Sequence, residues 1–133
     1  SIVCGMAPVA VLCVVALAVL MTFMGLTMSL LRVANAPQQK GTLFDRCHFV
    51  QLNTAEFAPI ICIMILFIHF SSFIARKDVT QYSESLMIAT TGARLVFAAA
   101  RGLGLPTVVG IASKGLEYLG MFLLAFDMLS YCT

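Results

Sequence analysis

The sequence predicts an all-α integral membrane protein, a four-helix bundle, and two observations lead to this fold class. The chain has 133 residues, of which 61% are hydrophobic and 11% charged, whereas a soluble domain has about 45–50% apolar and about 25% charged residues. Residues 2–31 form one uncharged run, and as a helix this run exceeds a hydrocarbon core of about 30 Å. Because so short a chain cannot bury all its apolar surface, we expect a lipid bilayer around a single domain over residues 1–133.

The charge and cysteine content argue against several other classes of protein. Eight Lys and Arg residues against six Asp and Glu give a net charge of only +2, so we expect no nucleic-acid partner. The five cysteines form no CxxC pair, so neither a disulfide framework nor a zinc site is indicated. We interpret the cysteines as small buried hydrophobic residues.

The uncharged run 2–31 is interpreted as the first transmembrane helix. A secretory signal peptide is the alternative, since Ala34-Asn35-Ala36 resembles a cleavage site. Such a peptide has an apolar core of about 7–15 residues behind a basic start, whereas this run is longer and no Lys or Arg precedes it. Residues 32–43 are polar, contain Pro37 and Gly41, and predict the first loop.

Three more helices are predicted after this loop. The second covers about residues 44–74, with a polar first half and an apolar second half, and a charged loop at 75–78 ends it. The third covers about 83–103, with Ser83 or Ser85 as its cap, and the fourth covers about 107–130 after a short Gly- and Pro-containing connection. Four crossings make the protein multi-pass, and the positive-inside rule favours the first-loop side as cytoplasmic.

The polar half of the second helix contains the most informative residues. At about 100° per residue, Arg46, Asn53 and Glu56 fall in one stripe, while Gln51 points to the opposite side. An ionisable group within a transmembrane helix is costly unless it is paired. We therefore expect Glu56 to face the bundle interior and to pair with Arg94 or Arg101 of the third helix. The same network can either fix helix packing or form a binding site.

Two other candidates carry simpler interpretations. Lys114 and Glu117 stand at i and i+3 on the fourth helix, so we expect them to pair with each other. His69 lies in an apolar stretch and is a weak candidate for a metal ligand. Metal sites need several converging ligands, so no metal site is predicted.

The segment 46–59, RCHFVQLNTAEFAP, resembles the signature of the membrane-associated proteins in eicosanoid and glutathione metabolism (MAPEG), which include the microsomal glutathione transferases. The matching QxNxxExxP core consists of Gln51, Asn53, Glu56 and Pro59. The third helix carries Ala93-Arg94-Leu95, similar to the ARL element of that family, and Gly104-Leu105-Pro106 follows. The resemblance covers essentially the whole chain and marks it as a divergent member.

The resemblance implies a homotrimer that holds glutathione between subunits near the cytoplasmic face. A cation beside the thiol would lower its pKa and favour the nucleophilic thiolate, which attacks a lipophilic electrophile. The residues that the resemblance assigns to glutathione, if the protein is active, are Arg46, Gln51, Asn53, Glu56 and Arg94. In an inactive protein the same residues form a structural network.

The sequence departs from the family pattern where the chemistry takes place. Phe49 stands where a basic residue is usual, and Phe97 and Arg101 stand where tyrosines would fall. Thr107-Val108-Val109 follows the connection, where an arginine would be expected. Arg101 is then the candidate catalytic cation, replacing a lost one.

Two functions follow from this comparison. One is a catalytically degenerate, structural or accessory subunit that packs against lipid, pigment or partner proteins in a membrane complex. The other is a glutathione transferase or peroxidase acting on lipophilic electrophiles. If the protein is a catalytically degenerate subunit, we expect the groove between the second and third helices near the first loop to lack converging cations.

Overall fold

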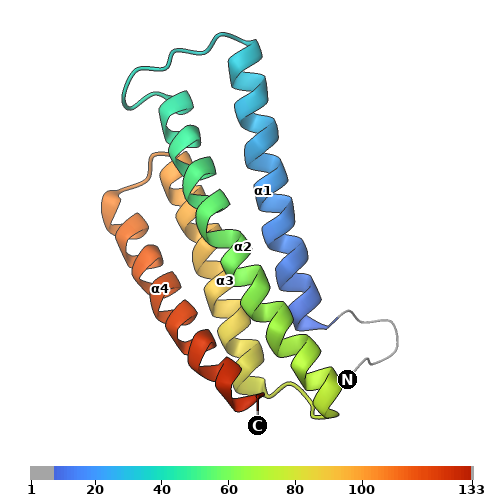
Figure 1. Ribbon diagram of the computed structural model, residues 1–133. Coiled ribbons are helices and arrows are strands. Elements are labelled where there is room, and N and C mark those ends of the chain that lie inside the picture. Colours follow the sequence, from blue (N-terminus) through green and yellow to red (C-terminus); the bar gives the residue numbers. More distant parts are fainter. Residues whose placement is uncertain (1–7, 133) are drawn as a thin grey trace.

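The computed structural model describes residues 8–132 and consists of four α-helices, with no strand in that range. The helices are α1 (Val9–Val33), α2 (Leu43–Ala75), α3 (Gln81–Gly102) and α4 (Thr107–Ser130). They run up and down in sequence, so the α1–α2 and α3–α4 connections lie at one end of the bundle and the α2–α3 connection at the other (Figure 1). The predicted all-α four-helix fold is confirmed.

The two central helices are α2 and α3, and α1 and α4 flank them on opposite sides (Figure 1). The closest packing is between α3 and α4 and between α1 and α2, while α1 and α4 do not contact each other within residues 8–132. The α1, α2 and α4 helices are each long and apolar enough to cross a membrane, whereas α3 is not. It carries Arg94 in its middle and Arg101 in its last turn, and its neighbours on both sides shelter much of its surface.

Local chemistry explains where the helices begin and end. The Thr42 and Thr80 hydroxyls accept hydrogen bonds from the N–H groups of Asp45 and Ser83, capping α2 and α3. At the end of α2, Arg76 adopts a left-handed conformation with φ 56°, and the Lys77 N–H returns to the Ser72 carbonyl.

The predicted boundaries of α2, α3 and α4 lie within two residues of the observed ones. The expected cap at Ser83 or Ser85 is wrong, because Thr80 begins α3 earlier. The predicted first helix began at residue 2; α1 begins at Val9, and residues 2–7 lie outside the described residues.

The buried apolar side chains form two clusters along the bundle. The larger lies toward the α2–α3 connection and includes Leu17, Ile61, Ile65 and Leu124. The smaller lies toward the first loop and includes Met28, Val50 and Ala98. Along α2 and α3, polar residues separate the two clusters, and these residues form the first candidate site.

Candidate functional site

The centre of the bundle contains a buried ion pair between α3 and α4. Arg94 and Glu117 both have fully buried side chains, and Nε of Arg94 donates to Oε2 of Glu117 at 2.5 Å. Nη2 of Arg94 donates to Oε1 of the same carboxylate at 3.2 Å. Two parallel N–H donors match the two carboxylate oxygens, which is the strongest geometry for such a pair.

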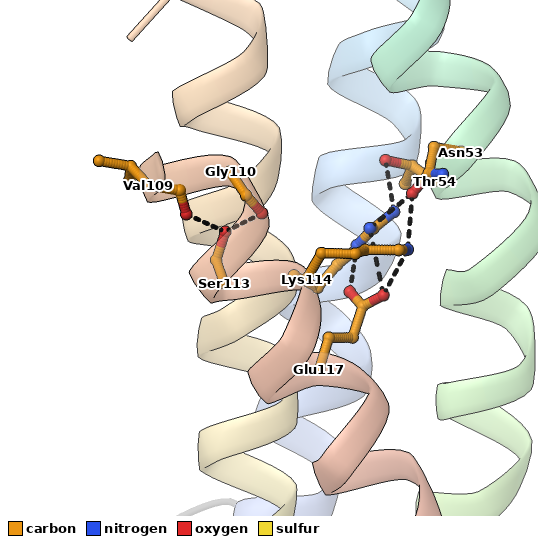
Figure 2. Close-up of polar contacts among 8 residues, drawn as sticks. Asn53, Thr54, Val109, Gly110, Ser113, Lys114 and Glu117 are labelled. Atoms are coloured by element: carbon orange, nitrogen blue, oxygen red, sulfur yellow. Dashed lines mark hydrogen bonds and ion pairs between the residues drawn. The ribbon is translucent and has the colours of Figure 1, made fainter. Parts of the chain in front are cut away.

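Side chains from α2 and a second cation complete this network, as Figure 2 shows. Oδ1 of Asn53 accepts from Nη2 of Arg94 at 2.7 Å and from Nζ of Lys114 at 2.9 Å. Nζ of Lys114 also donates to Oε1 of Glu117 at 2.8 Å, so the predicted i, i+3 pair is confirmed. Thr54 contributes its hydroxyl oxygen to Nη1 of Arg94 at 3.5 Å. We call Asn53, Thr54, Arg94, Lys114 and Glu117 the central polar network.

Aromatic rings surround the cations of the central polar network. Nζ of Lys114 lies 3.4 Å from the ring centroid of Phe57 and 5.0 Å from that of Tyr118. The Arg94 guanidinium lies 4.7 Å from the ring centroid of Phe97. The network holds two cations and one carboxylate, and the negative faces of these rings offset part of the excess positive charge.

The prediction for Glu56 is wrong. Glu56 is exposed, and neither Arg94 nor Arg101 contacts it with a hydrogen bond or ion pair within residues 8–132. The buried side of α2 passes through Val50, Thr54 and Ala58, and Glu56 is turned about 200° from Thr54. The predicted inward-facing stripe of α2 was defined by its polar residues instead of by its packed face, and it therefore included Glu56.

Two other predicted site residues lie away from the central polar network. Gln51 turns toward α1, where its Nε2 approaches the position a Cβ would take at Gly25 to 4.0 Å. His69 is partly buried, with its ring 5.5 Å from the ring of Phe70. Within residues 8–132, no group of three His, Cys, Asp or Glu side chains is placed to hold a metal ion.

The other two predicted residues, Arg46 and Arg101, line a cavity of about 240 Å³ at the first-loop end of the bundle. The full lining is Lys40, Gly41, Asp45, Arg46, Phe49, Ala100, Arg101, Gly104 and Leu105. We call it the first-loop cavity. Its cations Lys40, Arg46 and Arg101 outnumber its one carboxylate, so the expectation that this region lacks converging cations is wrong. The replacements in the helices, on which this expectation rests, do not account for Lys40 of the loop.

The aromatic replacements occupy the places that the resemblance assigns to polar groups. Phe49 lines the first-loop cavity, with the Arg101 guanidinium 5.0 Å from its ring centroid. Phe97 is buried, 6.3 Å from Phe49 between ring centroids. These rings therefore lie between the central polar network and the cavity.

No family model, curated protein or solved structure matches this chain.

Glu117 is the main residue whose role the sequence interpretation missed, and the sequence holds a signal for it. Arg94 lies about 12 Å along the helix axis from the end of α3, and Glu117 about 15 Å from the start of α4. Since a short connection joins these antiparallel helices, the two residues lie at similar depth. Because Arg94 and Glu117 lie at similar distances from the α3–α4 connection, their side chains meet without spanning a large offset along the helix axes. This similar distance identifies Glu117 as the partner of Arg94.

Proposed function

We propose that the chain is a non-catalytic structural or accessory subunit of a membrane complex, with four crossings and a MAPEG-like architecture. In this role it packs against lipid, pigment or partner proteins, as a homotrimer or within a larger assembly. One observation carries the proposal: the charged and polar groups of the central polar network form hydrogen bonds with one another. The carboxylate of Glu117 and the amide oxygen of Asn53 accept hydrogen bonds from both cations, and Arg94 is completely buried.

The side chains near this network support the same role. Phe97 has no hydroxyl to stabilise a thiolate, and its ring packs against Arg94. The buried Ser113 hydroxyl donates to the carbonyls of Val109 and Gly110 in its own helix (Figure 2). Losing a thiolate-stabilising donor costs about 3–4 kcal/mol of barrier lowering. These groups already have partners within the bundle, so few of them remain available for transition-state chemistry.

The experiment for this function is purification from the native membrane in a mild detergent, followed by measurement of subunit stoichiometry. A structural subunit migrates with other membrane proteins in a fixed molar ratio that survives a second separation. Its depletion should reduce the amount of the assembled complex. Recovery of the chain alone, with assembly of other membrane complexes unchanged on depletion, contradicts the proposal.

A glutathione transferase or peroxidase acting on lipophilic electrophiles is the second candidate, and the first-loop cavity favours it. Three cations around one cavity suit a tripeptide with two carboxylates. Here Arg101 would be the catalytic cation and glutathione the cofactor. Isothermal titration with glutathione, combined with a conjugation assay, tests it. Saturable binding and turnover that fall in Arg101→Ala but not in Arg32→Ala would establish the enzyme.

A further inference from the structure

The first-loop cavity lies where the α1–α2 loop, the start of α2 and the end of α3 meet. Arg46 joins these segments, since its Nη1 donates to the Gly41 carbonyl at 2.7 Å and its Nε to the Gly102 carbonyl at 3.2 Å. Helix ends of a membrane bundle lie at the level of the lipid headgroups. The cavity is therefore placed at the membrane interface, if the bundle spans the bilayer as proposed above.

The cavity has unused hydrogen-bond donors. Within residues 8–132, the side chains of Arg101 and Lys40 have no hydrogen-bond or ion-pair partner, and Nη2 of Arg46 has none. Asp45 is the single carboxylate of the lining, and its Oδ2 accepts from the Gly41 N–H at 3.0 Å. The lining thus has an excess of positive charge and several donors available to an anion.

A glycine lies close to the side chain of each of the two arginines. A Cβ at Gly110 of α4 would lie 3.0 Å from Cδ of Arg101. A Cβ at Gly104, whose φ is +73°, would lie 3.4 Å from Nε of Arg46. The ring of Phe49 faces the Arg101 guanidinium from within the same cavity. Arg46 is fixed by its two hydrogen bonds, so it binds an anion with less loss of side-chain freedom than a mobile cation does.

Apolar side chains border this cationic cavity. Phe49 and Leu105 line it and are 44% and 48% exposed, and Leu43 nearby in the sequence is 49% exposed. A ligand that suits both surfaces has a compact anionic group and an apolar tail. Guanidinium groups match phosphate oxygens in a two-pronged geometry, and basic pockets between membrane helices bind anionic headgroups.

We propose that the first-loop cavity binds the phosphate group of an anionic phospholipid, through Arg101, Lys40 and the free Nη2 of Arg46. The acyl chains then lie along the exposed apolar residues beside the cavity. This proposal rests on the membrane insertion in the proposed function but not on any partner protein or on catalysis.

The test measures lipid binding to the purified full chain in a neutral detergent, by native mass spectrometry. The probes are phosphatidylglycerol, the zwitterionic phosphatidylcholine and free glycerol phosphate. We expect phosphatidylglycerol to bind more tightly than the other two, and Arg101→Gln or Lys40→Gln to weaken it about tenfold each. Arg101→Lys keeps the charge and should restore part of the affinity.

The matched control is Arg32→Gln. Arg32 is an exposed arginine in the last turn of α1, at the same end of the bundle, but it does not line the cavity. If this variant weakens phosphatidylglycerol binding as much as Arg101→Gln does, the general positive field of this end explains the binding and the site is wrong. Circular dichroism of each variant establishes that it is folded.

The remaining outcomes also decide the proposal. Equal binding of phosphatidylcholine and phosphatidylglycerol overturns the anionic site, and equal binding of free glycerol phosphate overturns its assignment to a lipid. Glutathione that binds through Arg101 in place of the lipid supports the enzyme instead. Flotation with neutral phosphatidylcholine vesicles tests membrane insertion separately, so failure of the proposed membrane role is distinguished from failure of this site.

Discussion

The Arg94 guanidinium and the Glu117 carboxylate meet through two hydrogen bonds, of 2.5 and 3.2 Å, with both side chains fully buried. The pair joins α3 to α4, which are also among the most closely packed helices of the bundle. Breaking a buried ion pair by removing one partner is strongly destabilising, because the other charge is left without compensation.

The Glu117→Gln variant should lower the free energy of unfolding by about 3–5 kcal/mol, since Arg94 and Lys114 then share no counter-charge. Asp78→Asn is the control, because Asp78 is exposed in the α2–α3 connection and has no ion-pair partner within the described residues. Unfolding by sodium dodecyl sulfate in detergent micelles, followed by circular dichroism, measures both. Similar losses in the two variants would mean that the pair contributes nothing specific.

Asn53 should tolerate aspartate better than leucine. Its Oδ1 accepts from two cations, so Asn53→Leu leaves both donors short of a partner and should cost about 2–3 kcal/mol. Asn53→Asp keeps the acceptor and balances the excess cation of the network, so it should retain most of the wild-type stability. The same unfolding titration compares the two variants, and a greater loss in Asn53→Asp would contradict this charge assignment.

The close approach of α3 and α4 at Gly120 should not accept a methyl group. A Cβ there would clash with Oγ1 of Thr90, so Gly120→Ala should lower stability by about 1–3 kcal/mol through overpacking. Gly115→Ala, on the same helix with nothing within 4 Å of its Cβ position, is the control.

A double variant tests whether Thr90 causes the Gly120 effect. Adding Thr90→Ala removes the hydroxyl that the new methyl group meets, so the two changes should be less than additive. Additive losses of stability in the double variant would mean that the strain in Gly120→Ala does not come from the Thr90 hydroxyl.

The Tyr131 hydroxyl should stabilise the end of the bundle that lies opposite the first-loop cavity. It accepts from the Thr80 N–H at 3.1 Å and lies 2.8 Å from Oγ of Ser83, linking the end of α4 to the start of α3. Tyr131→Phe should cost about 1–2 kcal/mol, because a partly buried N–H loses its acceptor. Tyr82→Phe removes an exposed hydroxyl and should cause little change in thermal unfolding. Equal effects in the two variants would exclude a specific contribution from Tyr131.

Much of the fold is predictable because it depends on local patterns. Long apolar runs, a polar loop and a Gly-Pro connection give the helices and their order, and the Lys114–Glu117 pair follows from spacing within one helix. Whether Glu56 can reach Arg94 depends on which face of α2 packs inward, and this face is chosen by contacts with α1 and α3. The polar pattern of α2 alone therefore predicts the wrong position for Glu56.

The first-loop cavity was harder to predict for a similar reason. Lys40 comes from a loop, Arg46 from the start of α2 and Arg101 from the end of α3. Only the turn of the chain at that end brings these cations to one place. The helix periodicity that identified Arg46 contains no information about the loop.

The central polar network also sets the height of α2, α3 and α4 relative to one another. Apolar faces alone permit a helix to slide by one turn, about 5.4 Å, with little change in contact chemistry. Such a slide would separate Arg94 from Glu117 and remove Asn53 from both cations, because these contacts join α2, α3 and α4 at one level. For a bundle that spans the bilayer as proposed, these three helices therefore respond to a thicker or thinner bilayer by tilting as a unit or by deforming the lipid around them, without sliding past one another.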